Sequence, residues 1–322
     1  MSLKLAVKDW LDVLDREYLQ TFIAEGGAAV KVAVGDAFDR ARLAEAIASR
    51  ATERGYFAIH IDASKCRAHM PQDLFHAIAG KIDWRLLARS RLLALASGLG
   101  YDIDPIDPAA AVVPAIAELG GIGEDAVRME LRRALHDEVL ASVHMGRDFR
   151  SAMFHLCLAE LQDDGGFYGC HPILDWLTGE NNRIGPLRPF SLRTPINRTT
   201  ARHFIESALY WLRAARYSGT VILFDASRVT LARNPRDGER YYTRAMAIDH
   251  YELLRGFIDD TDRLTATLLI VATSPEFIDD QAPRGWRIYD ALRTRVMDDV
   301  RDREYANPVA ALVRVGEMES SL

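Results

Sequence analysis

The chain has 322 residues, of which 49% are hydrophobic and 27% charged, so it has room for one large α/β domain or two smaller ones, and disorder is excluded over most of it. Its formal net charge of −6 provides no global attraction for nucleic acid and leaves only a local basic patch for that purpose. No apolar run of about 18 residues and no signal-peptide pattern occur, which predicts a cytoplasmic protein without a membrane contact.

The three cysteines, Cys66, Cys157 and Cys170, have spacings that fit neither a disulfide framework nor a structural zinc site. Cys170 and His171 form the only adjacent pair of soft ligands. A small buried residue beside a loop histidine explains this pair without a metal. We therefore predict no metal site.

The N-terminal part of the chain shows a helix followed by alternating strands and helices. Apolar residues between Leu3 and Phe22 recur at a mostly helical spacing, which predicts an amphipathic helix over 3–24. A strand over 30–34, a helix over 40–53 and a strand over 56–61 follow. Continuous apolar strands separated by a helix are typical of a parallel sheet buried on both faces.

The turn after the first strand resembles a phosphate-binding loop that lacks the residues that bind a nucleotide. Such a loop needs G-x-x-x-x-G-K-[ST], in which backbone N–H groups surround the phosphates, the lysine contacts the terminal phosphates and the hydroxyl holds Mg²⁺. Counted from Gly35, this frame places Arg40 at the second glycine, Ala41 at the lysine and Arg42 at the hydroxyl residue. Only the first glycine of the pattern is present.

Residues 66–190 have helical periodicity and no comparable strand signal. Helices are expected over 71–82, 86–99, 126–143 and 153–161. We predict a single α/β domain whose core is formed by residues 1–65 and 195–322, with a large helical insertion over 66–190. Within the insertion, Asp102, Asp104 and Asp107 favour helix capping over a cation loop, because prolines interrupt the stretch.

Residues 181–218 are strongly basic, with seven arginines against one glutamate, Glu206. The arginines are Arg183, Arg188, Arg193, Arg198, Arg202, Arg213 and Arg216. Solvated side chains explain this charge most simply, and a phosphate-binding surface is the alternative. Arg193, Arg198 and Arg202 flank the start of a helix expected over 199–216. We predict that these three form a contact surface for carboxylates of a partner protein, which we favour, or for nucleic-acid phosphates.

The last third of the chain supplies three more strands. Residues 221–224 are followed by Asp225, as in a Walker B strand, where the aspartate orients Mg²⁺ and a following glutamate polarises water. Ala226 occupies the position of that glutamate. A strand over 267–272 leads to Thr273 and Ser274, at the place where such ATPases keep a polar residue that senses the terminal phosphate.

Helices over 240–258 and 286–300 and a last strand over 310–315 complete the expected elements. Five buried strands alternating with helices favour a doubly wound parallel sheet. Because ligands bind at the carboxyl ends of such strands, Gly35, Asp62, Asp225 and Thr273 should converge there.

Stretches spread over most of the chain resemble the P-loop ATP-binding proteins of the BREX phage-exclusion systems, a branch of the AAA+-like ATPases. The matching stretches are EYL to GGAAVK (17–31), PINR (195–198), YSGTVILFD (217–225), ATSPEF (272–277) and YDALRTR (289–295). The resemblance implies an AAA+-like P-loop fold with a five-stranded parallel sheet in the order 5-1-4-3-2. It also implies an ATP and Mg²⁺ site and an arginine sensor, for which Arg293 and Arg295 are the candidates.

The chain departs from this family pattern where the chemistry would happen. Relatives with an intact site would carry glycine, lysine and threonine at Arg40, Ala41 and Arg42, and glutamate at Ala226. Each such loss typically costs a few kcal/mol of transition-state stabilisation. Arg40 and Arg42 are expected to face solvent, with an anion at the helix N-terminus as the alternative. The degenerate nucleotide site would comprise Gly35, Arg40, Ala41, Arg42, Asp225, Ala226 and Thr273.

The favoured hypothesis is a non-hydrolysing P-loop protein, without a bound cofactor, that is a structural or regulatory partner in prokaryotic phage-defence or DNA-transaction machinery. The expected partner is a protein, such as another component of the defence system, with DNA as the alternative. A rewired ATPase, in which an arginine replaces the missing lysine, is a second hypothesis. A third is a nucleic-acid-binding module built on residues 183–216.

Overall fold

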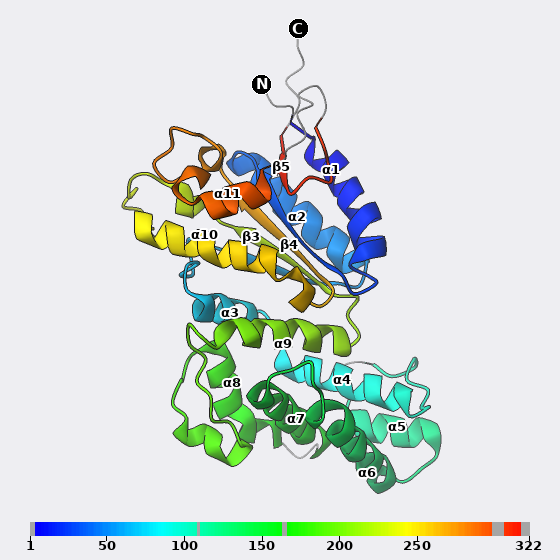
Figure 1. Cartoon of the computed structure of the whole chain (residues 1–322). Coiled ribbons are helices and arrows are strands. Elements are labelled where there is room, and N and C mark those ends of the chain that lie inside the picture. The colour runs from blue at the N-terminus through cyan, green and yellow to red at the C-terminus, as the bar shows by residue number, and fades with distance from the viewer. Residues whose placement is uncertain (1–3, 108–109, 163–165, 298–305, 317–322) are drawn as a thin grey trace. The chain divides into compact units, whose positions relative to one another are not determined.

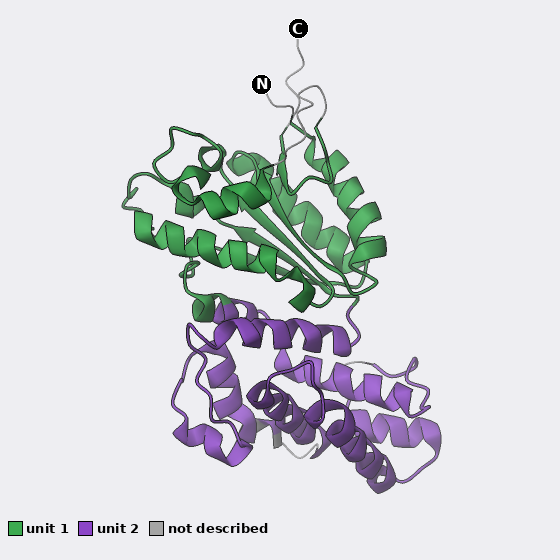
Figure 2. Ribbon diagram, viewed as in Figure 1, with its two compact units in different colours: residues 1–74, 218–322 green, residues 75–217 purple. Residues whose placement is uncertain are grey.

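The computed structural model describes residues 4–107, 110–162, 166–297 and 306–316. The chain divides into two compact units (Figure 2): unit 1 comprises Met1–Leu74 and Ser218–Leu322, and unit 2 comprises Phe75–Tyr217. The helical unit therefore begins and ends later in the sequence than the insertion expected over 66–190. The cause at its C-terminal end is helix α9 (Ala201–Ala214), whose Phe204 ring packs 5.2 Å from the ring of Trp176 and 5.8 Å from that of Phe75.

Unit 1 contains all five predicted strands. They are β1 (Ala28–Val34), β2 (Phe57–Asp62), β3 (Thr220–Asp225), β4 (Thr267–Thr273) and β5 (Leu312–Arg314). Its helices are α1 (Val7–Val13), the π-helical η1 (Leu14–Phe22), α2 (Ala37–Glu53), α10 (Arg244–Asp259) and α11 (Asp290–Val296), with short turns η5 (Ser227–Thr230), η6 (Thr261–Arg263), η7 (Pro275–Phe277) and η8 (Trp286–Ile288). Helix α3 (Pro71–Ala79) contains the boundary between the two units.

The five strands form one all-parallel sheet in the order β2-β3-β4-β1-β5 (Figure 1). The predicted order 5-1-4-3-2 is confirmed. In the register, Val34 lies opposite Thr273, Ala272 opposite Asp225, and Asp225 opposite Asp62. The carboxyl ends of β2, β3, β4 and β1 consequently lie side by side.

Helices cover both faces of the sheet (Figure 1). On one face, Ala33, Leu223 and Ile270 share a core with Trp10 of α1 and Leu43 of α2. On the other face, the ring of Phe224 lies 5.3 Å from the ring of His250 in α10. Burial on both faces explains why these strands read as continuous apolar runs in the sequence.

Several predicted elements have different boundaries in the structure. The helix expected over 3–24 begins only at Val7, because the backbone of Leu5 bridges to Val315 and donates a hydrogen bond to Arg314 O (2.8 Å). Helix α2 begins at Ala37, three residues before the prediction, and β5 has only three residues. The segment expected to be helical over 286–300 is divided between η8 and α11, and its positions 298–300 lie outside the described residues.

The part of unit 2 that the structure describes contains helices and no strand, as predicted. After α3 come α4 (Trp84–Gly98), α5 (Val112–Gly120), α6 (Glu124–Leu135), the π-helical η2 (His136–Leu140), α7 (Arg147–Gln162), η3 (Gly166–Cys170), α8 (His171–Thr178), η4 (Gly185–Phe190) and α9. Phe149, Trp176 and Leu92 are fully buried in its core. Glu160 is also buried and forms ion pairs with Arg85 (2.9 Å) and Arg89, so its charge is compensated inside the helical unit.

Candidate functional site

The turn between β1 and α2 is too short to form a phosphate-binding loop. Only Gly35 and Asp36 separate Val34, the last residue of β1, from Ala37, the first residue of α2. The carboxylate of Asp36 caps the helix by accepting a hydrogen bond from the N–H of Asp39 (2.9 Å). Positions 37–42, which the G-x-x-x-x-G-K-[ST] frame assigns largely to a loop, therefore lie in the first turns of a helix.

Packing explains the single glycine that remains from the motif. The N–H of Gly35 donates to Thr273 O (3.0 Å). A Cβ atom at position 35 would lie 2.9 Å from Cγ2 of Val315, which is closer than van der Waals contact permits. Gly35 is thus required by the close approach of the C-terminal segment, and no phosphate has to be invoked to account for it.

Arg40 does not face solvent as the sequence suggested. Its side chain is only 12% exposed, and its guanidinium reaches back over the carboxyl ends of the strands. Nη1 donates to Gly35 O at 2.8 Å, and Nε lies 3.4 Å from Oδ2 of Asp225. The expectation failed because it treated α2 as starting at position 40, whereas the earlier start turns this side chain inward.

Asp225 and Ala226 follow β3 as a Walker B strand would end, and their contacts are internal. Oδ1 of Asp225 accepts the N–H of Ser227 (2.9 Å), while Oδ2 faces Arg40. The N–H of Ala226 donates to Ala272 O (2.8 Å), and Ala226 is buried. In an ATPase this aspartate would orient Mg²⁺, whereas here it faces a guanidinium.

The remaining residues of the predicted nucleotide site are divided between buried and exposed positions. Thr273 is buried at the end of β4, and its hydroxyl has no hydrogen-bond partner in the described structure. Ala41 and Arg42 are exposed on α2. The Arg42 guanidinium lies over the exposed ring of Phe38, 5.5 Å from its centroid. The structure consequently brings Gly35, Arg40 and Asp225 together with Thr273 nearby in the strand register, and leaves Ala41 and Arg42 outside.

Carboxylates occupy the N-terminus of α2, where a phosphate would bind in an intact loop. Asp36 is exposed, and the N–H of Asp39 holds the pKa of its carboxyl below the usual value. Asp39 is itself buried in the first turn. Because the positive end of the helix dipole already interacts with two acidic residues, an incoming phosphate meets repulsion there instead of attraction.

Ion pairs also join residues of the segments that follow β2 and β3. Arg228 donates to Asp237 (Nη1 to Oδ2, 2.7 Å) and to the carbonyl of Arg240 (2.6 Å), and Lys65 pairs with Glu239. The hydrogen bond from Arg228 lowers the pKa of Asp237 to about 2. These contacts connect the loop that follows β3 internally and to Lys65, which follows β2.

The two candidates for an arginine sensor have intramolecular partners. Arg293 lies 3.6 Å from Asp290 and over the ring of Trp286, 6.0 Å from its centroid. Arg295 pairs with Asp259 of α10 and donates to Ala291 O (2.8 Å). Both side chains thus contact neighbouring residues of unit 1.

The three predicted contact residues of the basic stretch 181–218 differ in their surroundings. Arg202 lies 3.5 Å from Glu206, four residues further along α9. Arg193 and Arg198 are exposed, and the backbone N–H of Arg193 donates to Oδ2 of Asp148 (3.0 Å). A carboxylate of the protein itself therefore compensates Arg202, while Arg193 presents its side chain to solvent.

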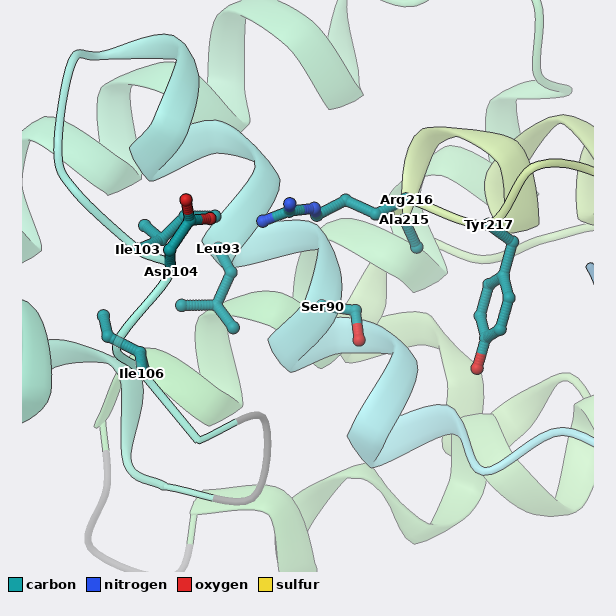
Figure 3. A pocket seen from close by; sticks show the side chains of 8 residues that line it. All are labelled: Ser90, Leu93, Ile103, Asp104, Ile106, Ala215, Arg216 and Tyr217. Atoms are coloured by element: carbon teal, nitrogen blue, oxygen red, sulfur yellow. The ribbon is translucent and has the colours of Figure 1, made fainter. Parts of the chain in front are cut away.

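A hollow of about 390 Å³ lies between the end of α9, α4 and the segment 103–106 of unit 2. Leu93, Ile103 and Ile106 give it apolar walls, and Figure 3 shows the side chains of Asp104 and Arg216 pointing toward one another from opposite sides. No ion pair joins these two side chains among the described residues. Arg216 also has φ +77°, a left-handed backbone conformation that usually favours glycine. Sequence reasoning did not identify this hollow, because its walls come from three separate segments.

The described residues define an α/β protein with a five-stranded, all-parallel sheet between two helical layers. The chain belongs to the family described as BREX system ATP-binding protein BrxC/D, whose model matches residues 11–321. This membership connects the chain with phage-defence machinery and confirms the resemblance seen in the sequence. No curated protein and no solved structure matches the chain.

The family name implies ATP, and the residues at the carboxyl ends of the strands do not fit it. The loop that would surround the phosphates is absent, Asp36 and Asp39 oppose an anion at the helix N-terminus, and Arg40 lies on the aspartate that would orient Mg²⁺. Within the described ranges, no group of three or more histidine, cysteine or acidic residues could hold a metal ion. No helix in those ranges is long and apolar enough to cross a membrane.

Proposed function

We propose that this chain is an AAA+-like P-loop protein that does not hydrolyse ATP and that serves as a structural or regulatory partner of other components in BREX-type phage defence. One observation carries the proposal: the guanidinium of Arg40 bridges Gly35 O and the carboxylate of Asp225. In a working site a lysine and Mg²⁺ would meet phosphate oxygens in this region. Here a side chain of the protein itself neutralises the aspartate.

Several groups would have to change together before turnover could begin. Ala41 offers no ammonium group and is exposed, and Ala226 offers no carboxylate and is buried. We therefore expect Ala41→Lys alone to leave the protein inactive, because the helix would still start at Ala37 and Arg40 would still cover Asp225. Loss of several such groups makes turnover negligible.

Calorimetric titration with Mg-ATP and a turnover assay test the proposal on the full chain. We expect no heat of binding at micromolar protein, no nucleotide retained after purification, and no phosphate release by wild type or by Ala41→Lys. Turnover by wild type that disappears in Asp225→Ala would overturn the proposal. It would support the rewired ATPase, in which Arg40 leaves Asp225 and contacts the nucleotide.

The partner role is tested by co-purification with the proteins encoded beside this chain. Wild type and the Ala41→Lys variant should recover the same partners with or without ATP, because the proposed role does not depend on a nucleotide cycle. A partner that binds only when ATP is added would contradict a nucleotide-independent role.

A further inference from the structure

A second hollow of unit 2, of about 350 Å³, lies at the N-terminal ends of α7 and α9. The residues that matter for its chemistry are Gly146, Arg147 and Asp148 at the start of α7, Arg193 in the segment before α9, and His203 in α9. We call this hollow the α7–α9 pocket. It contains one of the three arginines predicted from the sequence and adds Arg147, which lies outside the basic stretch.

The charges of the α7–α9 pocket are not balanced. The described structure contains no ion pair for the guanidinium of Arg147 or Arg193, and both side chains are exposed. The one carboxylate in the pocket wall, Asp148, is buried, and its Oδ2 accepts the N–H groups of Arg193 (3.0 Å) and Thr194. Two cations against one anion leave a net charge near +1.

The start of α7 and the segment before α9 also supply polar groups to the pocket wall. Gly146, the residue before the helix, has no side chain to cap it, and its N–H donates to Ser207 Oγ (3.0 Å). The hydroxyls of Thr199 and Thr200 donate to Asn197 Oδ1 and Pro195 O, each at 2.8 Å. The donors that these contacts leave to the pocket are therefore the two guanidiniums, which suit an oxyanion.

We propose that the α7–α9 pocket binds a phosphodiester group of a single-stranded nucleic acid. A phosphodiester carries one negative charge, which matches the pocket, whereas a terminal phosphate carries about −1.5 to −2 and would leave charge uncompensated near Asp148. A planar carboxylate would use fewer of the donors that converge from α7 and from the segment before α9.

A pair of stacked aromatic rings beside α9 supports a strand of nucleic acid over an isolated ion. The exposed ring of His144 stacks on the ring of Tyr210, with centroids 4.8 Å apart. Tyr210 lies seven residues beyond His203 on the same helix, which is about 10 Å along its axis. A base adjacent to the bound phosphate can stack on His144, a contact that does not depend on sequence. This proposal does not depend on whether unit 1 binds ATP.

The test measures binding of a labelled single-stranded DNA of about 12 nucleotides to the full chain by fluorescence anisotropy at about 50 mM salt. The double variant Arg147→Gln/Arg193→Gln should raise the Kd at least about ten-fold and make the salt dependence shallower by about 0.7 on a log–log scale for each phosphate that is no longer neutralised. The matched control is Arg188→Gln, which removes an exposed arginine of the same basic stretch that does not line the pocket. It should bind like wild type.

Three outcomes would overturn the proposal. The first is equal binding by wild type and the double variant, or an equal reduction in Arg188→Gln. The second is full competition by inorganic phosphate or adenosine monophosphate, added at the same concentration as the phosphodiester groups of a saturating amount of DNA. This result would assign the pocket to a free phosphate. The third is equal competition by polyglutamate of matched charge, which would assign it to carboxylates of a protein. Thermal melts that coincide for all variants ensure that weaker binding does not reflect unfolding.

Discussion

Arginines at the carboxyl ends of the unit 1 strands and arginines in the α7–α9 pocket of unit 2 are in opposite states. Arg40 is 12% exposed and directs its charge to Asp225 and Gly35 O. Arg147 and Arg193 are exposed, and no carboxylate pairs with their guanidiniums among the described residues. Both places combine a helix N-terminus with arginine, but only the second leaves positive charge for a ligand.

The difference shows that the partners of the charged groups decide whether a degenerate motif can still bind a ligand. At the end of β1, the phosphate-binding motif has neither its lysine nor its loop. The remaining charged groups, Arg40 and Asp225, contact each other, so neither charge is left for a ligand to neutralise. In the α7–α9 pocket no motif exists, yet the uncompensated groups create a place for an anion. Removal of one partner of an internal ion pair leaves a buried charge uncompensated, whereas removal of an exposed, unpaired charge does not, and this distinction can be tested by mutation.

The largest effect is expected for Arg40→Ala, which leaves Asp225 without its guanidinium. Because both side chains are largely buried, we expect the free energy of unfolding to fall by about 2–3 kcal/mol in denaturant titration. Adding Asp225→Asn should recover about 1 kcal/mol, since the unpaired charge is then removed. Arg42→Ala, on the exposed face of the same helix, is the control and should change stability by less than about 0.5 kcal/mol. An equal decrease in the free energy of unfolding of Arg40→Ala and Arg42→Ala would show that the contact between Arg40 and Asp225 contributes nothing specific.

A pH-dependent loss of stability is expected from His250, which packs against Phe224 just before Asp225. Burial lowers the pKa of His250 to about 4, from an ordinary value of 6.5. Between these values the unfolded chain binds the proton and the folded chain does not, so stability falls as the pH decreases. We expect a loss of about 2 kcal/mol between pH 7 and pH 5. Denaturant titrations at both pH values should show a smaller difference for His250→Gln than for wild type, and equal differences would contradict the assignment.

A smaller loss is expected for Gly35→Ala. The added Cβ would lie 2.9 Å from Val315 Cγ2, so the C-terminal segment has to shift, at a cost of about 1–2 kcal/mol. The companion change Val315→Ala removes the colliding methyl group and should make the Gly35→Ala substitution less costly, which a double-mutant cycle of unfolding free energies measures. Additive effects of the two substitutions would show that their side chains do not meet.

The smallest effect is expected for Arg147→Gln/Arg193→Gln in the α7–α9 pocket. Since neither guanidinium takes part in an internal ion pair within the described ranges, we expect the free energy of unfolding in the absence of nucleic acid to change by no more than about 0.5 kcal/mol. The contrast with Arg40→Ala makes the comparison quantitative. A decrease as large as that of Arg40→Ala would mean that both arginines are structural, and the pocket would then be a second internally satisfied site.

Much of the candidate site in unit 1 could be placed from the sequence, because strand ends are local features. The apolar run 221–224 ending in Asp225 and the run 267–272 ending in Thr273 indicated their positions, and parallel pairing then brought them to one edge. The inward turn of Arg40 was missed. The signal was present in Asp36 and Asp39, since an aspartate three residues before another polar residue is a helix-capping pattern that starts α2 at Ala37.

By itself, the amino-acid sequence determined the five strands, because periodicity depends on neighbours along the chain. The resemblance to the BREX ATP-binding family, which the family match confirms, supplied the order of the strands in the sheet. Only the tertiary structure decided that Arg40 lies on Asp225 and that α9 belongs to the helical unit. It also decided that Arg147 and Arg193, 46 positions apart, line one pocket. Such pairings depend on helix starts and on packing between segments distant in sequence, and a one-residue change in register turns a side chain from solvent to interior.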